Sequence, residues 1–394
     1  MDKMGFSFAD RVRNLGTETS FEVFAMAKEL ERNGAKIVHF EIGEPDFDTP
    51  QHIKDAAYKA LKAGFTHYTP APGIFELREA IAEKVSEDFE VDVDPVREVV
   101  VMPGAKTCIF TAILATVNAG DEVIISNPAY PIYESVVRLV DGVPVFVPLR
   151  EENDFRLVPE DVERKVTPRT KMVILNSPHN PCGSTLLKKD VAGLAEIAKE
   201  NNLWVMSDEI YSKIQYEGNF HGIVSEPDMK NRTILVDGFS KAYAMTGWRL
   251  GYATGNPEVI AHMVRLQINI CSCATSFVQM AAIEALKGSQ DCVKQMVREY
   301  DKRRKAMVSS LNSIKGFSCK MPSGTFYVFP NIKKLGLKSE ELMKFLLNKA
   351  GVATLHGDCF GKYGEGYLRL SYATNLENIR EGLNRIKEAI EGLS

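Results

Sequence analysis

The chain has 394 residues, with 48 Lys or Arg against 52 Asp or Glu, so its formal net charge at pH 7 is −4. This near balance gives no basic surface of the kind that binds nucleic acid or an anionic membrane. The start lacks the apolar run of a signal peptide, and no stretch of about 18 apolar residues predicts a membrane span. The seven cysteines form no CxxC pair or Cys/His cluster, so we expect reduced thiols, a cytoplasmic location and no metal site.

Short apolar runs alternate with helical patterns through the middle of the chain. Runs that predict buried strands lie at residues 99–102, 122–125, 171–175, 203–206 and 233–236. Apolar residues at helical spacing between the runs, as at 109–117 and 191–200, predict helices. This alternation predicts an α/β fold with a mostly parallel sheet covered on both faces. Because ligands bind beyond the carboxyl ends of such strands, we expect the functional residues directly after these runs.

The pattern changes near residue 290. A charged helical pattern at 292–314 leads to apolar segments at 325–329 and 367–372 and then to a final amphipathic helix, which predicts a separate α+β domain. We therefore predict an N-terminal arm that forms part of the small domain (1–45), a large domain (46–288) and a small C-terminal domain (289–394).

The sequence GFSKAYAMTGWRLG at 238–251 follows the fifth predicted strand. An isolated lysine is ordinarily a surface residue. Lys241, however, lies among small and apolar residues, where desolvation lowers the pKa of an amine and makes it a nucleophile toward carbonyls. Asp208 follows the fourth predicted strand, where a carboxylate can also be a simple helix N-cap.

Three further segments carry polar or charged groups that have both a structural and a functional interpretation. Residues 103–107 (PGAKT) form a glycine turn into a helix, and a helix N-terminus binds anions. Residues 176–183 (NSPHNPCG) are rich in turn formers, so they also suit an ordinary loop. Arg369 lies among apolar neighbours and requires an anionic partner, which is either a structural carboxylate or a ligand.

In this order, these segments resemble the class I and II aminotransferases, which are pyridoxal-5′-phosphate (PLP) enzymes of fold type I. The resemblance runs from about residue 10 to about residue 385 and is closest to the bacterial and archaeal aspartate, alanine and aromatic aminotransferases. It implies a large α/β domain with a mostly parallel sheet and a smaller α+β domain built from both termini.

The resemblance also implies the roles of individual residues. Lys241 would form the Schiff base with PLP, Asp208 would pair with the pyridine nitrogen, and Tyr211 would contact the phenolic oxygen. The remaining cofactor-binding residues would be Gly104, Ala105, Lys106, Tyr130, Asn180, Ser240, Arg249 and, across the interface of a homodimer with shared active sites, Tyr68. The substrate would be bound by Gly43, Asn180 and Arg369, with Arg369 clamping its α-carboxylate.

One position departs from the family pattern. Relatives often have a phosphate-binding serine three residues before the lysine, where this chain has Gly238. We expect the Lys106 side chain to compensate by giving the phosphate a cation.

The implied activity is ping-pong transfer of an amino group between an L-α-amino acid and a 2-oxo acid. A PLP-dependent lyase or cyclase on the same scaffold is the alternative, because most of the motifs are shared. We do not expect a PLP-sensing transcription regulator, because the near-neutral charge speaks against DNA binding and the residues before Phe21 leave no room for a DNA-binding domain. The side-chain specificity stays open: an acidic substrate would need a second cation in the pocket, and Phe21, Tyr68, Tyr130, Phe277 and Tyr327 suit either an apolar pocket or the core.

Overall fold

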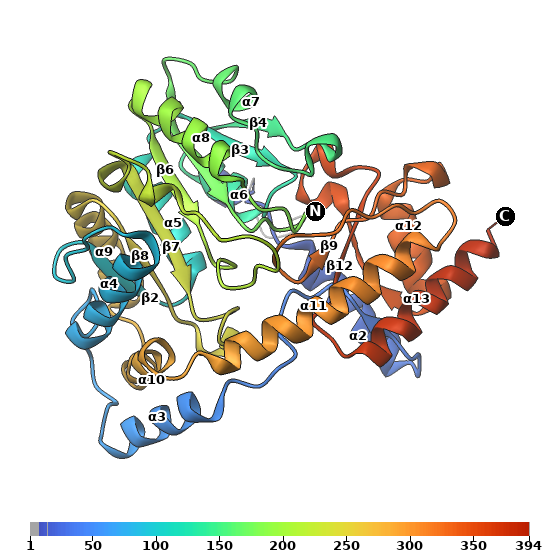
Figure 1. The fold of residues 1–394 in the computed structure, drawn as a ribbon, viewed down its shortest axis with the longest axis horizontal. Coiled ribbons are helices and arrows are strands. Elements are labelled where there is room, and N and C mark those ends of the chain that lie inside the picture. The colour runs from blue at the N-terminus through green and yellow to red at the C-terminus, as the bar shows by residue number, and fades with distance from the viewer. Residues whose placement is uncertain (1–7, 14, 394) are drawn as a thin grey trace.

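The computed structural model describes residues 8–13 and 15–393. A seven-stranded sheet in the order β2-β8-β7-β6-β5-β3-β4 lies at its centre (Figure 1). The adjacent strands β7, β6, β5, β3 and β4 pair in parallel, whereas β8 pairs antiparallel with both β7 and β2. The strands are β2 (Val99–Met102), β3 (Glu122–Asn127), β4 (Val143–Pro148), β5 (Thr170–Asn176), β6 (Trp204–Asp208), β7 (Thr233–Gly238) and β8 (Gly251–Thr254). The predicted α/β fold with a mostly parallel sheet is confirmed.

Helices cover both faces of this sheet, as alternate residues of β3 demonstrate. Val123 and Ile125 enter one buried cluster with α5 (Ala105–Thr116), whereas Ile124 enters another with α8 (Lys188–Glu200). Because successive side chains of a strand point to opposite faces, both faces are buried. The other helices around the sheet are α3 (Gln51–Lys62), α4 (Phe75–Phe89), α6 (Ile132–Leu139), α7 (Pro159–Glu163), α9 (Pro257–Cys271) and α10 (Ser276–Lys287).

Segments from both ends of the chain pack together beside the large sheet (Figure 1). Strand β1 (Val38–His39) pairs in parallel with β10 (Val352–Ala353). The helices of this part are α1 (Asp10–Arg13), α2 (Thr19–Arg32), α11 (Asp291–Asn312), α12 (Ser339–Phe345) and α13 (Leu376–Glu391). Its antiparallel sheet has the order β11 (Leu355–His356), β12 (Leu368–Ser371), β9 (Tyr327–Val328). The smaller part built from both termini is confirmed, while its boundaries at residues 45/46 and 288/289 stay a prediction.

Each of the five predicted strands is present, and two strands of the large sheet were not predicted. Strand β4 (sequence VPVFVP) contains two prolines, which cannot donate backbone hydrogen bonds to a neighbouring strand and therefore argue against a strand. They are tolerated because β4 lies at the edge of the sheet. Strand β8 (sequence GYAT) is short and holds few large apolar residues. Among residues 8–13 and 15–393, the helices lack the length and apolar character needed to cross a membrane.

Candidate active site

A cleft of about 470 Å³ opens at the carboxyl ends of the parallel strands. Asn176 and Asp208 are the last residues of β5 and β6, and Lys241 lies in the turn after β7. The N-terminal arm and the small sheet complete the walls. Predicted residues that line the cleft are Gly43, Ala105, Lys106, Tyr130, Asn180, Asp208, Tyr211, Ser240, Lys241, Arg249 and Arg369.

Lys241 has the environment of a reactive amine. Burial lowers the pKa of its ammonium to about 8. Its Nζ donates a hydrogen bond of 2.5 Å to the Gly43 carbonyl oxygen and lies 5.7 Å from the centre of the Phe326 ring. An amine with this pKa is partly neutral near physiological pH, so it can act as a nucleophile or a base.

Asp208 is a buried carboxylate at the base of the cleft, and 3% of its surface is exposed. Desolvation raises its pKa to about 6, although hydrogen bonds from Tyr133 and from the Ile210 amide oppose this rise. The Tyr133 hydroxyl donates to Oδ2 over 2.5 Å, and the Ile210 amide donates to Oδ1 over 3.2 Å. The residues after Asp208 form a turn and not a helix, so the carboxylate does not cap a helix.

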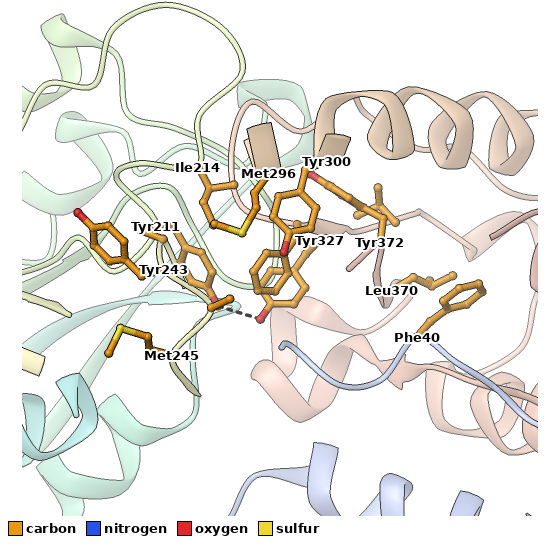
Figure 2. Packing of buried hydrophobic residues seen from close by; sticks show 14 of the residues in the cluster. Phe40, Tyr211, Ile214, Tyr243, Met245, Met296, Tyr300, Tyr327, Leu370 and Tyr372 are labelled. Atoms are coloured by element: carbon orange, nitrogen blue, oxygen red, sulfur yellow. Dashed lines mark hydrogen bonds between the residues drawn. The ribbon is translucent and has the colours of Figure 1, made fainter. Parts of the chain in front are cut away.

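Tyr211 and Tyr327 join the large sheet to the small one across the cleft. Their hydroxyl oxygens are 2.8 Å apart and share a hydrogen bond (Figure 2). Burial raises the pKa of Tyr211 well above its usual value, so its hydroxyl stays protonated and can donate to an anionic oxygen.

Arg369 is a buried guanidinium, with 4% of its surface exposed. One terminal nitrogen donates to the Glu41 carbonyl oxygen, and the other approaches the Asn180 side-chain oxygen at 3.4 Å. Its Nε is buried without a partner, and within residues 8–13 and 15–393 no carboxylate pairs with it. The structural carboxylate that could have paired with Arg369 is therefore absent from the described residues. The buried guanidinium can accept an anionic ligand instead.

The turn into α5 forms an anion cradle. Gly104 has φ of 90°, and a Cβ there would lie 2.5 Å from an Arg249 terminal nitrogen, so glycine lets the guanidinium approach the helix N-terminus. Helix α5 has 12 residues and begins with Ala105 and Lys106, whose amides are free of helical acceptors. Ser240 lies on the same cleft.

The side chain of Lys106 turns toward the N-terminal arm. Its ammonium contacts the Glu18 carboxylate, which also accepts a hydrogen bond of 2.9 Å from the Tyr130 hydroxyl. The predicted contact of the Lys106 side chain with the phosphate stays a prediction. Tyr68 lies away from this cleft, and 88% of its surface is exposed in the single chain.

Sequence reasoning missed Tyr133 and Glu18. Tyr133 lies in the first turn of α6, three residues after Tyr130. This spacing, close to one helical turn, was a signal that could have placed Tyr133 on the cleft side together with Tyr130. Glu18 belongs to no motif, and only the folding of the arm brings it to the cleft. His179 is a buried loop residue whose Nε2 lies 3.2 Å from the Ser126 hydroxyl, and burial lowers its pKa to about 3.

These groups fit PLP. A buried aspartate suits the protonated pyridine nitrogen, and the cradle of α5 and Arg249 suits a phosphate. A lysine of lowered pKa in the same cleft suits the aldehyde carbon. The fit rests on this chain's own donors and acceptors.

Comparison with known proteins also points to a PLP enzyme. The family model of aminotransferase class I and II matches residues 35–386. The chain is 41% identical over 99% of both sequences to an aspartate aminotransferase of Pyrococcus horikoshii, and 40% identical over 98% of both to aromatic-amino-acid aminotransferase 2 of Thermococcus litoralis. The solved structure of an alanine aminotransferase from Pyrococcus furiosus superposes with a TM-score of 0.93 at 33% identity, covering 98% of this chain and 100% of that one.

These relatives are named as aminotransferases, so the lyase or cyclase alternative is not favoured. The fold, the cleft and the family match agree along almost the whole chain. The chain therefore belongs to the class I and II aminotransferases and is a PLP-dependent enzyme that transfers amino groups.

Proposed function

We propose that amino-group transfer takes place in this cleft with Lys241 as the catalytic base, Asp208 and Tyr211 as cofactor-tuning residues and Arg369 as the α-carboxylate site. The observation that carries the proposal is the combination of a lysine with a pKa of about 8 and a buried arginine without a described carboxylate partner. A base and an anion site in one cleft suit a substrate that has a Cα–H bond next to a carboxylate.

PLP, when bound, withdraws electrons from the substrate's Cα and makes its C–H bond acidic. The α5 N-terminus and Arg249 would hold the phosphate, and Asp208 would hold the ring nitrogen. The other groups around the cofactor would be Gly104, Ala105, Tyr130, Asn180, Tyr211, Ser240 and the backbone amide of Lys106, whose ammonium contacts Glu18.

Arg369 and Asn180 would fix the α-carboxylate, and the Gly43 backbone would border it. With the carboxylate fixed, the Cα–H bond points in one direction, which is a positioning effect. The neutral Nζ of Lys241 would remove the Cα proton, and the resulting ammonium would return a proton to the product. The Gly43 carbonyl, which accepts a hydrogen bond from Nζ, would hold the amine in place between these steps.

A homodimer with shared active sites is the second part of this proposal. Apolar side chains around α3 and the following loop are exposed in the single chain, and a patch of this kind suits an interface: Tyr58, Leu61, Phe65 and Tyr68. Tyr68 would reach the phosphate bound by the partner chain.

Mixed dimers test this arrangement. A dimer of one Lys241→Ala chain and one Tyr68→Ala chain contains one site with both Lys241 and Tyr68 if Tyr68 acts across the interface. We expect that site to regain wild-type PLP affinity. If Tyr68 acted within its own chain, no site would contain both residues and none would recover.

The substrates proposed are an L-α-amino acid and a 2-oxo acid, in the cytoplasm. The seven free cysteines suit a reducing compartment. The experiment mixes the PLP-loaded enzyme with single amino acids in the absence of an acceptor. We expect one equivalent of 2-oxo acid per site and no free ammonia. Continuous release of ammonia would identify a lyase and overturn the proposal.

A further inference from the structure

Glu18 connects the N-terminal arm to the large domain inside the cleft. It directly precedes α2, yet its Oε1 accepts from the Lys106 ammonium and, over 2.9 Å, from the Tyr130 hydroxyl. These partners lie 88 and 112 positions further along the chain. Because 22% of the Glu18 side chain is exposed, this carboxylate belongs to the wall of the cleft and not to the open surface.

The charged side chains of the cleft indicate what the Glu18–Lys106 contact does. Four cationic side chains line it: Lys106, Lys241, Arg249 and Arg369. The last three have roles in the proposed function, as base, phosphate site and α-carboxylate site. Over the part of the chain that the structure describes, Lys106 is the one of the four that forms an ion pair, and its partner is Glu18.

The cation left over for a substrate side chain is therefore neutralised by the chain's own carboxylate. The arm next to Glu18 adds uncharged groups, Ser20 and Phe21, and α5 adds Ile109. A substrate with an acidic side chain would have to displace Glu18 from Lys106 or place a second carboxylate beside it. Two carboxylates held close together repel each other, and displacing a charge-assisted contact also costs free energy.

We infer that Glu18 is a specificity-determining residue that disfavours amino acids with acidic side chains and favours those with uncharged side chains. A neutral side chain lies against Phe21 and Ile109 without disturbing the Glu18–Lys106 contact. Specificity of this kind comes from a repulsive element against the wrong substrate as much as from attraction to the right one. The inference rests on the proposed role of Arg369, which fixes the α-carboxylate and so directs the side chain.

The test compares Glu18→Gln with the wild type. Glutamine keeps the shape of the side chain and an acceptor for Lys106 and Tyr130 but removes the negative charge. We expect the ratio of kcat/KM for aspartate and glutamate to that for alanine and phenylalanine to rise about tenfold or more. The matched control is Glu22→Gln, which removes the same charge from an exposed residue of α2 outside the cleft and should leave the ratio unchanged.

Binding measurements give a readout independent of turnover. Titration of the PLP-loaded enzyme with succinate and with propionate, followed by cofactor absorbance, should show tighter succinate binding in Glu18→Gln and unchanged propionate binding. Adding Lys106→Met to Glu18→Gln should abolish that gain. An equal change for both acids, or a gain that survives the loss of Lys106, overturns the inference.

These outcomes separate the two proposals. If the wild type formed no 2-oxo acid from any amino acid, the proposed function would fail, and the binding of succinate against propionate would still decide the role of Glu18. If the wild type transaminates and neither ratio moves in Glu18→Gln, the inference about Glu18 alone is wrong.

Discussion

Tyr133 donates a hydrogen bond of 2.5 Å to the Oδ2 oxygen of Asp208 at the base of the cleft. Both residues are buried, with exposed fractions of 1% and 3%. Burial raises the pKa of Asp208 to about 6, and the Tyr133 hydroxyl is the largest of the contacts that lower it. The tyrosine therefore favours the ionised carboxylate, which is the form that can pair with a protonated ring nitrogen.

The first prediction concerns the pH dependence of cofactor binding. If Asp208 holds the ring nitrogen as proposed, PLP binding needs its ionised form, so the PLP affinity of the apoprotein should fall as the pH drops through about 6. In Tyr133→Phe the pKa of Asp208 rises further, so this loss should begin at a higher pH. The measurement is the PLP dissociation constant between pH 5 and pH 8. Tyr243→Phe is the control, because its hydroxyl bonds Gln290 away from the cleft. An unmoved pH profile in Tyr133→Phe would contradict the assignment.

The second prediction separates catalysis from folding at Asp208. Asp208→Asn should lower kcat by ~10²-fold or more, about 3 kcal/mol of barrier, because an amide does not hold the ring nitrogen protonated. The apoprotein should not lose stability at pH 8. The folded pKa of Asp208 lies above the usual 3.8, so its ionisation opposes folding as the pH rises through about 6. Urea unfolding at pH 8 and steady-state rates check both parts; near-normal turnover would show that the carboxylate is structural.

The third prediction concerns Lys241. Borohydride treatment of the PLP-loaded enzyme should attach the cofactor to this residue, as peptide mapping would reveal. Lys241→Ala should still bind PLP through the α5 cradle and Arg249 but lose turnover. Lys213→Ala is a suitable control, since that ammonium pairs with Asp88 outside the cleft. Labelling of a different lysine would remove the central role given to Lys241.

Much of the fold could be predicted because each buried parallel strand contains a continuous apolar run, as at residues 172–175 in β5. The residues at strand ends, such as Asp208 and Lys241, follow from the same rule, because parallel strands bring their carboxyl ends to one edge. The individual roles proposed for them came from the resemblance to a known family. Local sequence thus carries information about the residues that a strand itself positions.

Contacts between distant segments could not be predicted in this way. Glu18 meets Lys106 only because the arm folds over the cleft, and no local pattern records that contact. Gly238 is a related case. It faces Gly251 across the antiparallel pair β7–β8, and a Cβ at Gly238 would lie 3.0 Å from the Gly251 Cα. Glycine at this position therefore has a packing reason, which was hidden because β8 itself was not predicted.

The last prediction distinguishes recognition of the α-carboxylate from recognition of the side chain. Arg369 presents a buried guanidinium whose Cζ lies 4.4 Å from the centre of the Tyr327 ring and 5.1 Å from the centre of the Phe360 ring. The rings fix the plane of the guanidinium, and its contacts with Asn180 and Glu41 fix its rotation. A planar group held in this way suits two parallel hydrogen bonds to a carboxylate.

Arg369→Ala should therefore weaken every amino acid and every 2-oxo acid by a similar factor, about a hundredfold in kcat/KM, because all share the α-carboxylate. Arg369→Lys should recover little, since an ammonium lacks the two-pronged geometry. The matched control is the substrate: phenethylamine lacks the carboxylate of phenylalanine and should react equally slowly with wild type and variant. The measurement is kcat/KM for alanine, aspartate, phenylalanine and phenethylamine. A loss confined to aspartate would mean that Arg369 binds the side-chain carboxylate, and the α-carboxylate site would then have to lie elsewhere in the cleft.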